Sequence, residues 1–307
     1  MFRVLFTAEK AQKIDVDLRS VYLDLADFEQ WKSWSPWICQ EPDCPVTFEG
    51  TAGSVGHSMA WKGQRIGEGK MTLMTTDNES LFEYQLDIVT PFKSRSDVKI
   101  LLLSDGDSTQ VRWTMQGGLP FFLFFLKKMM SKVISCDYQR GLSMLKDRLE
   151  KKEVASVSEL KGVEVQNLRY FVGKKGSCHP DNMEQAMSEV FCDMELPEGG
   201  LGGSIYHKYD FLNDHVDFAC GYFLDSAPKA SEGFEILVVP EHKALRADHT
   251  GAYRHLGNGW ATAMGCQRSQ KHKLNKGVAM YEIYRNDPSS VDHERELLTE
   301  IYVPVRA

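Results

Sequence analysis

The sequence predicts an α+β protein in two parts: an antiparallel sheet packed around a long C-terminal helix, then two pseudo-repeated strand-helix-strand-strand units. Three observations support this fold class. The 307 residues exceed what one hydrophobic core usually serves. The first half alternates like strands and then turns helical, and the second half repeats one pattern. A content of 42% hydrophobic and 26% charged residues is typical of globular proteins.

The first half contains short strands separated by turn signals. Residues 70–75, 81–89, 96–103 and 109–116 alternate apolar and polar positions, as strands with one buried face do. Turn residues such as Lys62-Gly63 and Asp77-Asn78 lie between them. From Lys127 to Lys152 the spacing of apolar residues becomes helical. We therefore expect an antiparallel meander followed by one long helix.

The most apolar run is LPFFLFFL, residues 119–126. Its eight residues are too few for a transmembrane helix, which needs about 20. We expect this run to be the buried start of the long helix. The N-terminus lacks the long apolar segment of a signal peptide, and seven cysteines suit reduced thiols better than a disulfide framework. These features favour a cytoplasmic protein without a membrane span.

A polar stretch follows the long helix and marks the expected domain boundary. It contains few large apolar residues, which is typical of an exposed linker. We place the first domain at residues 1–152, the linker at 153–162 and the second domain at 163–307.

Several motifs of the first domain occur in a recognisable order: DFEQWKSWSPW at residues 27–37, Gly53-x-x-Gly56, Trp61-Lys62-Gly63, Gly67-x-Gly69 and GLSMLKDRLE at 141–150. Together they resemble the SRPBCC superfamily of polyketide cyclase-like and START-like domains. The resemblance implies a helix-grip fold with an apolar cavity between sheet and helix.

Candidate residues for lining this cavity come from the strands and from the start of the helix. They are Trp61, Tyr84, Trp113, Met115, Phe122 and Met129. The alternative, ordinary core packing, applies to each of them. For the tryptophans Trp31, Trp34 and Trp37, capping the open end of the sheet is the alternative to forming a cavity mouth.

The second half contains two copies of one pattern, which indicates a duplicated architecture. In the first copy, a strand near residues 163–172 leads to a helix at about 181–191 and then to GGSIYHKYDFLND and VDFACGYFL. In the second, residues 242–247 lead to HTGAY, a helix at about 259–269, YEIYRNDP and LLTEIYVPV. Each copy is a strand, a helix and two further strands.

The best-matching segments are YHKY, residues 206–209, and YEIY, residues 281–284. Alternation along a strand predicts that His207 and Tyr209 share one face and that Glu282 and Tyr284 share the corresponding face. Tyr206 is then expected on the opposite face, toward the helices. An acidic residue within an aromatic-rich strand is either exposed, paired or functional.

HTGAY, the paired units, YEIYRNDP and LLTEIYVPV resemble a GyrI-like effector-binding domain, also found behind DNA-binding modules in AraC-type regulators. The resemblance implies that Glu282 is the anion of a ligand groove. The aromatic walls would be Tyr284, Tyr253, Trp260 and Tyr209. Ring faces and a desolvated carboxylate both attract cations, so flat aromatic cations are favoured. A pairing of Glu282 with His207 would make the groove less anionic.

Other functional motifs are missing from the sequence. Cys39 and Cys44 lack a second pair at zinc-site spacing, and we predict no metal site. A Walker loop and a dinucleotide fingerprint are absent, so we predict no cofactor. The net charge of -7 and the lack of a helix-turn-helix segment disfavour direct nucleic-acid binding. Protein partners and oligomeric state remain open.

Two functions are compatible with these features. The first is binding of a small, lipophilic molecule, by sensing or sequestration and without chemistry. The second is hydrolysis of a reactive small-ring compound, as the resemblance to some GyrI-like hydrolases implies. In that case Glu282 would be the general base, with a pKa raised by burial, and Tyr284 or Tyr253 would orient the substrate.

Overall fold

The computed structural model describes residues 3–192, 194, 197, 199–228 and 233–306. The chain divides into two compact units, residues 1–154 and 155–307. Each unit has its own sheet and its own hydrophobic clusters, and each is described by itself below.

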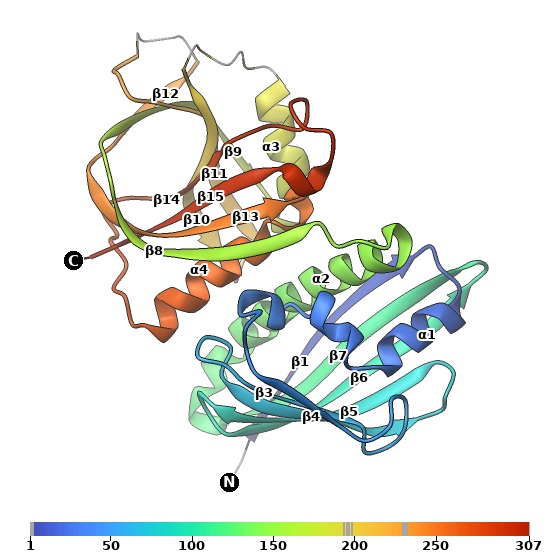
Figure 1. Cartoon of the computed structure of the whole chain (residues 1–307). Helices are drawn as coiled ribbons and strands as arrows, with labels where there is room; N and C mark the ends of the chain where they lie inside the picture. The colour runs from blue at the N-terminus through green and yellow to red at the C-terminus, as the bar shows by residue number, and fades with distance from the viewer. Residues whose placement is uncertain (1–2, 193, 195–196, 198, 229–232, 307) are drawn as a thin grey trace. The chain divides into compact units, whose positions relative to one another are not determined.

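The N-terminal unit is built on a seven-stranded antiparallel sheet in the order β1-β7-β6-β5-β4-β3-β2 (Figure 1). The strands are β1 (Arg3–Ile14), β2 (Val46–Glu49), β3 (Ser58–Lys62), β4 (Glu68–Thr76), β5 (Leu81–Thr90), β6 (Ser94–Asp105) and β7 (Ser108–Pro120). The four strands predicted from alternation are β4 to β7, and their prediction is confirmed. β1 was not among the predicted strands.

The long helix α2 (Lys127–Lys151) packs on this sheet, as predicted. A shorter helix, α1 (Leu18–Ala26), begins at Asp17, whose carboxylate accepts the backbone N–H of Ser20 and so caps the helix. Two 3-10 turns, η1 (Gln30–Ser33) and η2 (Ile38–Gln40), follow α1. The core between the sheet and these helices is one continuous cluster. This is the predicted helix-grip architecture.

The C-terminal unit contains an eight-stranded antiparallel sheet in the order β12-β9-β11-β10-β14-β15-β13-β8. The strands are β8 (Ser156–Gln166), β9 (Arg169–Cys178), β10 (Leu201–Asp210), β11 (His215–Leu224), β12 (Glu235–Val239), β13 (His242–Gly251), β14 (Met280–Tyr284) and β15 (Leu298–Val305). The helices are α3 (Met183–Cys192) and α4 (Gly257–Ser269). Short 3-10 turns lie at η4 (Pro180–Asn182), η5 (Tyr253–His255) and η6 (Glu294–Glu296).

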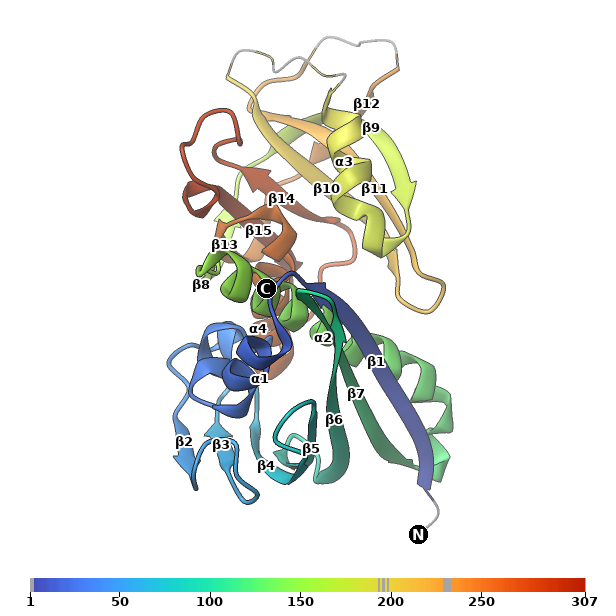
Figure 2. The same cartoon turned by 90° about the vertical axis from the view of Figure 1, so that its right-hand side faces the viewer.

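The duplication predicted from the sequence is visible in the strand order. One copy is β9-α3-β10-β11 and the other is β13-α4-β14-β15, and the copies meet where β10 pairs with β14. β8, which precedes the first copy, pairs with β13 of the second, and β12, which precedes the second copy, pairs with β9 of the first. The strand before each copy therefore forms the sheet edge beside the other copy. Figure 2 shows α3 lying across the face of β10 and β11. The centre of the sheet is therefore the seam between the copies.

Two expectations about chain segments are wrong. Residues 153–162 do not form a linker throughout, because β8 begins at Ser156 and pairs with β13; backbone pairing with an existing strand orders this polar stretch. The run at residues 119–126 is not buried either: Phe121–Leu126 is a 3-10 turn, η3, with no buried residue. Among the described helices, none combines the length and the apolar character that a membrane crossing requires.

Candidate ligand site around Glu282

Glu282 lies in the middle of β14, the central strand between β10 and β15, and its side chain is completely buried. The register places Ser204 of β10 and Ile301 of β15 opposite Glu282. Directly opposed residues share one face of a sheet. This face is covered by helices: Ile301 belongs to the cluster that packs against α4, and Cys220 and Phe218 of β11 belong to the one that packs against α3.

Three donors converge on the carboxylate of Glu282. The hydroxyl of Tyr284 donates to Oε1 at 2.6 Å, and the hydroxyl of Tyr206 donates to the same oxygen at 2.9 Å. The indole N–H of Trp260, on α4, donates to Oε2 at 2.9 Å. An ionised carboxylate has about four lone-pair positions. Oε1 thus has both positions filled, and Oε2 keeps one acceptor position open beside Trp260.

A hydrogen-bond chain extends from this site into β10 and β11. The hydroxyl of Ser204 lies 2.9 Å from that of Tyr284 and 3.3 Å from the thiol of Cys220. Since a phenol has one proton and Tyr284 donates it to Glu282, Ser204 must donate to Tyr284. The thiol of Cys220 is then left to donate to Ser204. Every proton in the chain points toward the carboxylate.

The electrostatics of the site follow from burial. Burial raises the pKa of Glu282, while the hydrogen bonds from Tyr284, Trp260 and Tyr206 oppose the rise. Burial and the nearby carboxylate also raise the pKa of Tyr206 and Tyr284 well above that of a free phenol. Burial raises the pKa of Cys220 to about 12. These groups therefore remain neutral donors at physiological pH.

No cationic side chain of the described residues forms an ion pair with Glu282. A buried charge without a counter-ion is unfavourable. The neighbouring Arg285 contacts Glu300 at 2.7 Å instead, and Glu300, directly opposite Ile283, lies on the other face of the sheet. Hydrogen bonds alone therefore compensate the carboxylate of Glu282.

Aromatic rings surround the carboxylate. Tyr206 packs edge-on against Trp260 with centroids 5.1 Å apart, and Tyr253 lies 5.4 Å from Tyr284. Phe191, at the end of α3, contacts Tyr284 from the other side at 5.8 Å. All five rings are partly exposed, whereas Glu282 is not. The rings therefore form a wall between solvent and the carboxylate. We call Glu282, Tyr206, Tyr284 and Trp260 the carboxylate cage.

The structure brings together most of the predicted groove residues and corrects the placements of Tyr209, His207 and Tyr206. Tyr284 and Trp260 bond to Glu282, and Tyr253 packs on Tyr284. Tyr209 shares the face of Val216 but stacks on Phe211 at 4.2 Å and is 38% exposed. His207 does not pair with Glu282; its Nε2 lies 3.8 Å from Glu235.

The misplacement of His207 and Tyr206 has one physical cause. Matching YHKY with YEIY set Tyr206 against Tyr281, but the register pairs Tyr206 with Met280, which places Tyr206 on the Glu282 face. A bulge between Tyr206 and Lys208 then breaks the alternation at His207. The sequence analysis did not identify four residues near the carboxylate: Tyr206, Ser204, Cys220 and Phe191. Only the register of the strands would have revealed the first three.

The candidate residues of the N-terminal unit lie in or beside its core. Trp113 and Tyr84 are buried, with Trp113 stacked on Tyr138 at 4.1 Å. Trp61 is partly buried, and its ring leaves no room for a Cβ at Gly69. Trp31 and Trp34 are buried in the same cluster. Phe122 and Met129, expected to line a cavity, are exposed instead. Phe122 belongs to the segment before α2, whose phenylalanines face outward, and Met129 is 40% exposed on the first turn of α2.

Two polar atoms in this aromatic core have no partner. The indole N–H groups of Trp34 and Trp113 are buried and make no hydrogen bond to any described residue, and the two rings are 5.7 Å apart. Such orphaned donors are rare in folded proteins. Trp34 and Trp113, together with Trp31 and Tyr138, form a second aromatic cluster, which we call the indole cluster.

Comparisons with known proteins agree with the division of the chain into two units. Residues 6–150 match a family model described as polyketide cyclase/dehydrase and lipid transport, and residues 166–306 match one described as a GyrI-like small molecule binding domain. A comparison with curated proteins found no match.

Three solved structures with some similarity each cover about half of this chain. The EcmrR C-terminal domain is 16% identical, with 49% of this chain and 98% of that chain covered and a TM-score of 0.39. Protein MLL2253 from Mesorhizobium loti is 14% identical, with 48% and 98% covered and a TM-score of 0.38. Ara h 8.0201 is 10% identical, with 48% and 99% covered and a TM-score of 0.36.

Proposed function

Because the chain joins a polyketide cyclase-type SRPBCC domain to a GyrI-like small molecule binding domain, we propose that it captures a small lipophilic cation at the carboxylate cage. The observation that carries this proposal is the buried carboxylate of Glu282. Three neutral donors bond to this carboxylate, and no cationic side chain of the described residues pairs with it. The ligand supplies the missing positive charge.

The shape of the cage supports a flat, aromatic ligand. Trp260, Tyr253 and Phe191 are partly exposed rings around one buried anion, and ring faces attract cations more strongly when water is excluded. The open acceptor position on Oε2 lies on the Trp260 side. A ligand that displaces or slides past Trp260 would reach the carboxylate there. Because His207 does not pair with Glu282, it does not reduce the preference of the site for cations that we propose.

The test uses two probes of nearly equal shape. N-Methylacridinium carries a positive charge and 9-methylanthracene does not, and both quench tryptophan fluorescence. We expect the cation to bind at least tenfold more tightly, which corresponds to about 1.4 kcal/mol or more. Glu282→Gln should remove that preference, whereas Glu241→Gln, at an exposed position, should leave it unchanged.

Equal binding of the two probes by the wild type would contradict the proposal. So would a preference for the cation that survives Glu282→Gln in a protein whose circular dichroism matches the wild type. Binding by Glu282→Gln to both probes with equal affinity is the expected result, since the aromatic wall remains and only the charge is removed.

The same geometry supports a second candidate, hydrolysis of a reactive small-ring compound. A carboxylate whose pKa is raised by burial accepts a proton more readily than an ordinary one. Glu282 would take a proton from the attacking water while the water oxygen bonds to a ring carbon and the bond from that carbon to the ring heteroatom breaks. The protonated Glu282 would then return the proton to the heteroatom, and Tyr284 or Tyr253 would orient the substrate. Product formation from a strained-ring electrophile, abolished by Glu282→Gln in the folded protein, would favour this candidate over binding alone.

A further inference from the structure

Four phenylalanines project from the segment that precedes α2. Phe121, Phe122, Phe124 and Phe125 are 60%, 54%, 65% and 64% exposed. Large aromatic side chains are rarely clustered on the surface of a monomeric protein unless the surface has a partner. We call these residues, together with Lys127, Lys128 and Lys132, the phenylalanine-lysine patch.

The local backbone explains why the rings are exposed. Phe121–Leu126 is a 3-10 turn with a kink at Leu123, and a 3-10 helix has three residues per turn. Residues three apart therefore lie in one row. Phe121 and Phe124 form one row, Phe122 and Phe125 form a second, and only the third row, with Leu123 and Leu126, is partly covered. The apolar run thus presents two aromatic rows to solvent.

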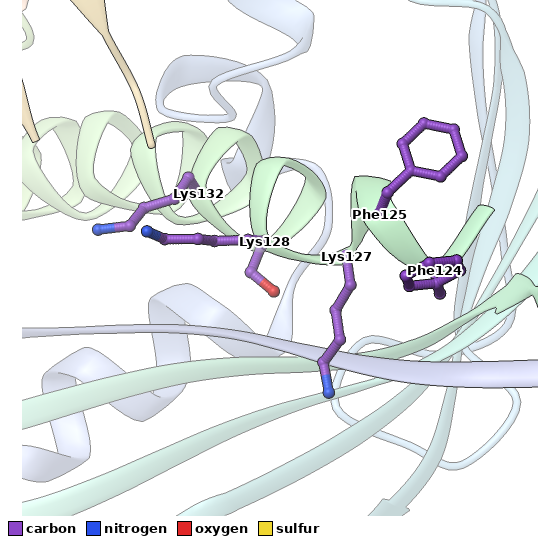
Figure 3. A pocket seen from close by; sticks show the side chains of 6 residues that line it. Phe124, Phe125, Lys127, Lys128 and Lys132 are labelled. Atoms are coloured by element: carbon purple, nitrogen blue, oxygen red, sulfur yellow. The ribbon is translucent and has the colours of Figure 1, made fainter. Parts of the chain in front are cut away.

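Lysines follow the rings on the first turns of α2. Phe124, Phe125, Lys127, Lys128, Ser131 and Lys132 line an open hollow of about 420 Å³. In Figure 3, Phe124 and Phe125 extend from the turn, and the lysine side chains extend from the adjoining helix. Residues 121–136 contain no aspartate or glutamate. This local positive charge contrasts with the net charge of -7 for the chain.

The apolar surface extends beyond the helix. Phe92, in the turn before β6, is 81% exposed, and Lys93 follows it in the chain. Since β6 runs antiparallel to β7 and pairs with it, the start of β6 lies at the end of the sheet where β7 leads into η3. Phe92 and Lys93 therefore lie at the same end of the sheet as the patch.

We propose that this patch binds the surface of membranes that contain anionic lipids. Rings of phenylalanine enter the boundary between head groups and acyl chains, and lysines contact the anionic head groups, as in interfacial amphipathic segments. The combination of adjacent aromatic rows with lysines and without acidic residues favours a lipid surface over a protein partner. The proposal does not depend on the carboxylate cage, which belongs to the other unit.

The experiment is co-sedimentation of the full chain with phosphatidylcholine vesicles, with and without phosphatidylserine. We expect binding to the anionic vesicles that weakens at high salt. The triple variant Lys127→Gln, Lys128→Gln, Lys132→Gln should bind them roughly 100-fold more weakly, or about fivefold per lysine. Phe124→Ser with Phe125→Ser should weaken binding at least tenfold, as an order-of-magnitude estimate from buried apolar area.

Matched controls separate the patch from charge and hydrophobicity in general. Lys271→Gln, Lys273→Gln and Lys276→Gln remove the same charge at exposed positions of the other unit, and Val55→Ser removes an apolar side chain that is 65% exposed. These variants should bind anionic vesicles like the wild type. Thermal unfolding of the phenylalanine variant should match the wild type, since Phe124 and Phe125 are mostly exposed.

Three results would overturn the proposal. The first is a wild-type protein that sediments with neither kind of vesicle. The second is unchanged vesicle binding by both patch variants. The third combines two observations: the wild type is a dimer by light scattering whereas the phenylalanine variant is a monomer, and the variant still binds vesicles. The patch would then be a contact between two copies of the chain.

Discussion

Two aromatic clusters of the chain, one in each unit, treat their polar atoms in opposite ways. In the carboxylate cage, the indole N–H of Trp260 and the hydroxyls of Tyr206 and Tyr284 all donate to one anion. In the indole cluster, the N–H groups of Trp34 and Trp113 have no acceptor within the part of the chain that the structure describes. The first cluster is organised around charge and the second around ring packing, so substitutions should affect them differently.

The largest expected effect is on the indole cluster. Trp113 is buried and contacts Trp31, Trp34, Trp37 and Tyr138, so Trp113→Ala should lower the free energy of unfolding of the N-terminal unit by about 3–5 kcal/mol. Denaturant titration followed by near-ultraviolet circular dichroism measures the loss.

The same variant tests whether the two clusters act separately. Binding of N-methylacridinium should be unchanged in folded Trp113→Ala, because the cage lies in the other unit. Trp260→Ala is the counterpart: it should weaken that binding, with a smaller loss of stability, because Trp260 is only partly buried. Loss of cation binding by Trp113→Ala would contradict this separation.

The next prediction isolates the indole N–H. Replacing Trp260 by 3-benzothienylalanine keeps the shape of the ring but removes the donor, which leaves Oε2 of Glu282 with no partner among the described residues. We expect a loss of about 1–3 kcal/mol in unfolding free energy. The same replacement at Trp34 breaks no hydrogen bond and should leave stability unchanged or slightly higher. Equal losses at the two positions would refute the contrast between the clusters.

A third prediction concerns pH. The pKa of Glu282 in the folded chain lies above the ordinary glutamate value of 4.5, so between these two values the folded chain binds more protons than the unfolded chain. The contribution of Glu282 to stability is then fully present below pH 4.5 and declines as the pH rises through the folded pKa. The difference in unfolding free energy between wild type and Glu282→Gln should fall over this range.

Cation binding should show the opposite dependence on pH, because the ligand needs the ionised carboxylate. The affinity for N-methylacridinium should rise as the pH passes upward through the pKa of Glu282 in the folded chain and then level off. Glu241→Gln, at an exposed position, serves as the control and should follow the wild type. An affinity that does not change with pH would show that Glu282 is not the group that attracts the cation.

Both folds could be predicted because their patterns are local. Alternation identified β4 to β7, helical spacing identified α2, and the repeated order of motifs identified the duplicated unit. Glu282 could be singled out because a carboxylate within an aromatic-rich strand requires compensation. The strands, the helix and the choice of Glu282 depend only on residues that are close together in the chain, and the duplication depends on comparing two such local patterns.

The donors of the cage could not be predicted in the same way. Which face Tyr206 occupies depends on the register between β10 and β14, which are separated by about 70 residues, and a shift of one residue reverses every side chain. Likewise, apolar composition alone predicted burial for residues 119–126, whereas the three-residue period of η3 exposes Phe121 and Phe124. The hydrophobicity of a side chain does not by itself determine whether the side chain faces the core or the solvent.

The smallest expected effect tests that register directly. Tyr206→Phe removes one hydroxyl that donates to Oε1 of Glu282 but keeps the ring against Trp260. Loss of one such bond should lower the unfolding free energy by about 0.5–1.5 kcal/mol and raise the pKa of Glu282 further, since one hydrogen bond that favours its ionised form is lost. Half-maximal cation binding should therefore move to higher pH.

His207→Ala is the matched control, because the letter match between the repeats placed His207, not Tyr206, beside Glu282. His207 lies 3.8 Å from Glu235, and its loss should change stability by no more than about 0.5 kcal/mol and leave the pH dependence of cation binding unchanged. The opposite result, in which His207→Ala shifts the pH dependence and Tyr206→Phe does not, would contradict the register described. The pairing of β10 with β14 would then differ by one residue, and His207 rather than the neutral donors would compensate Glu282.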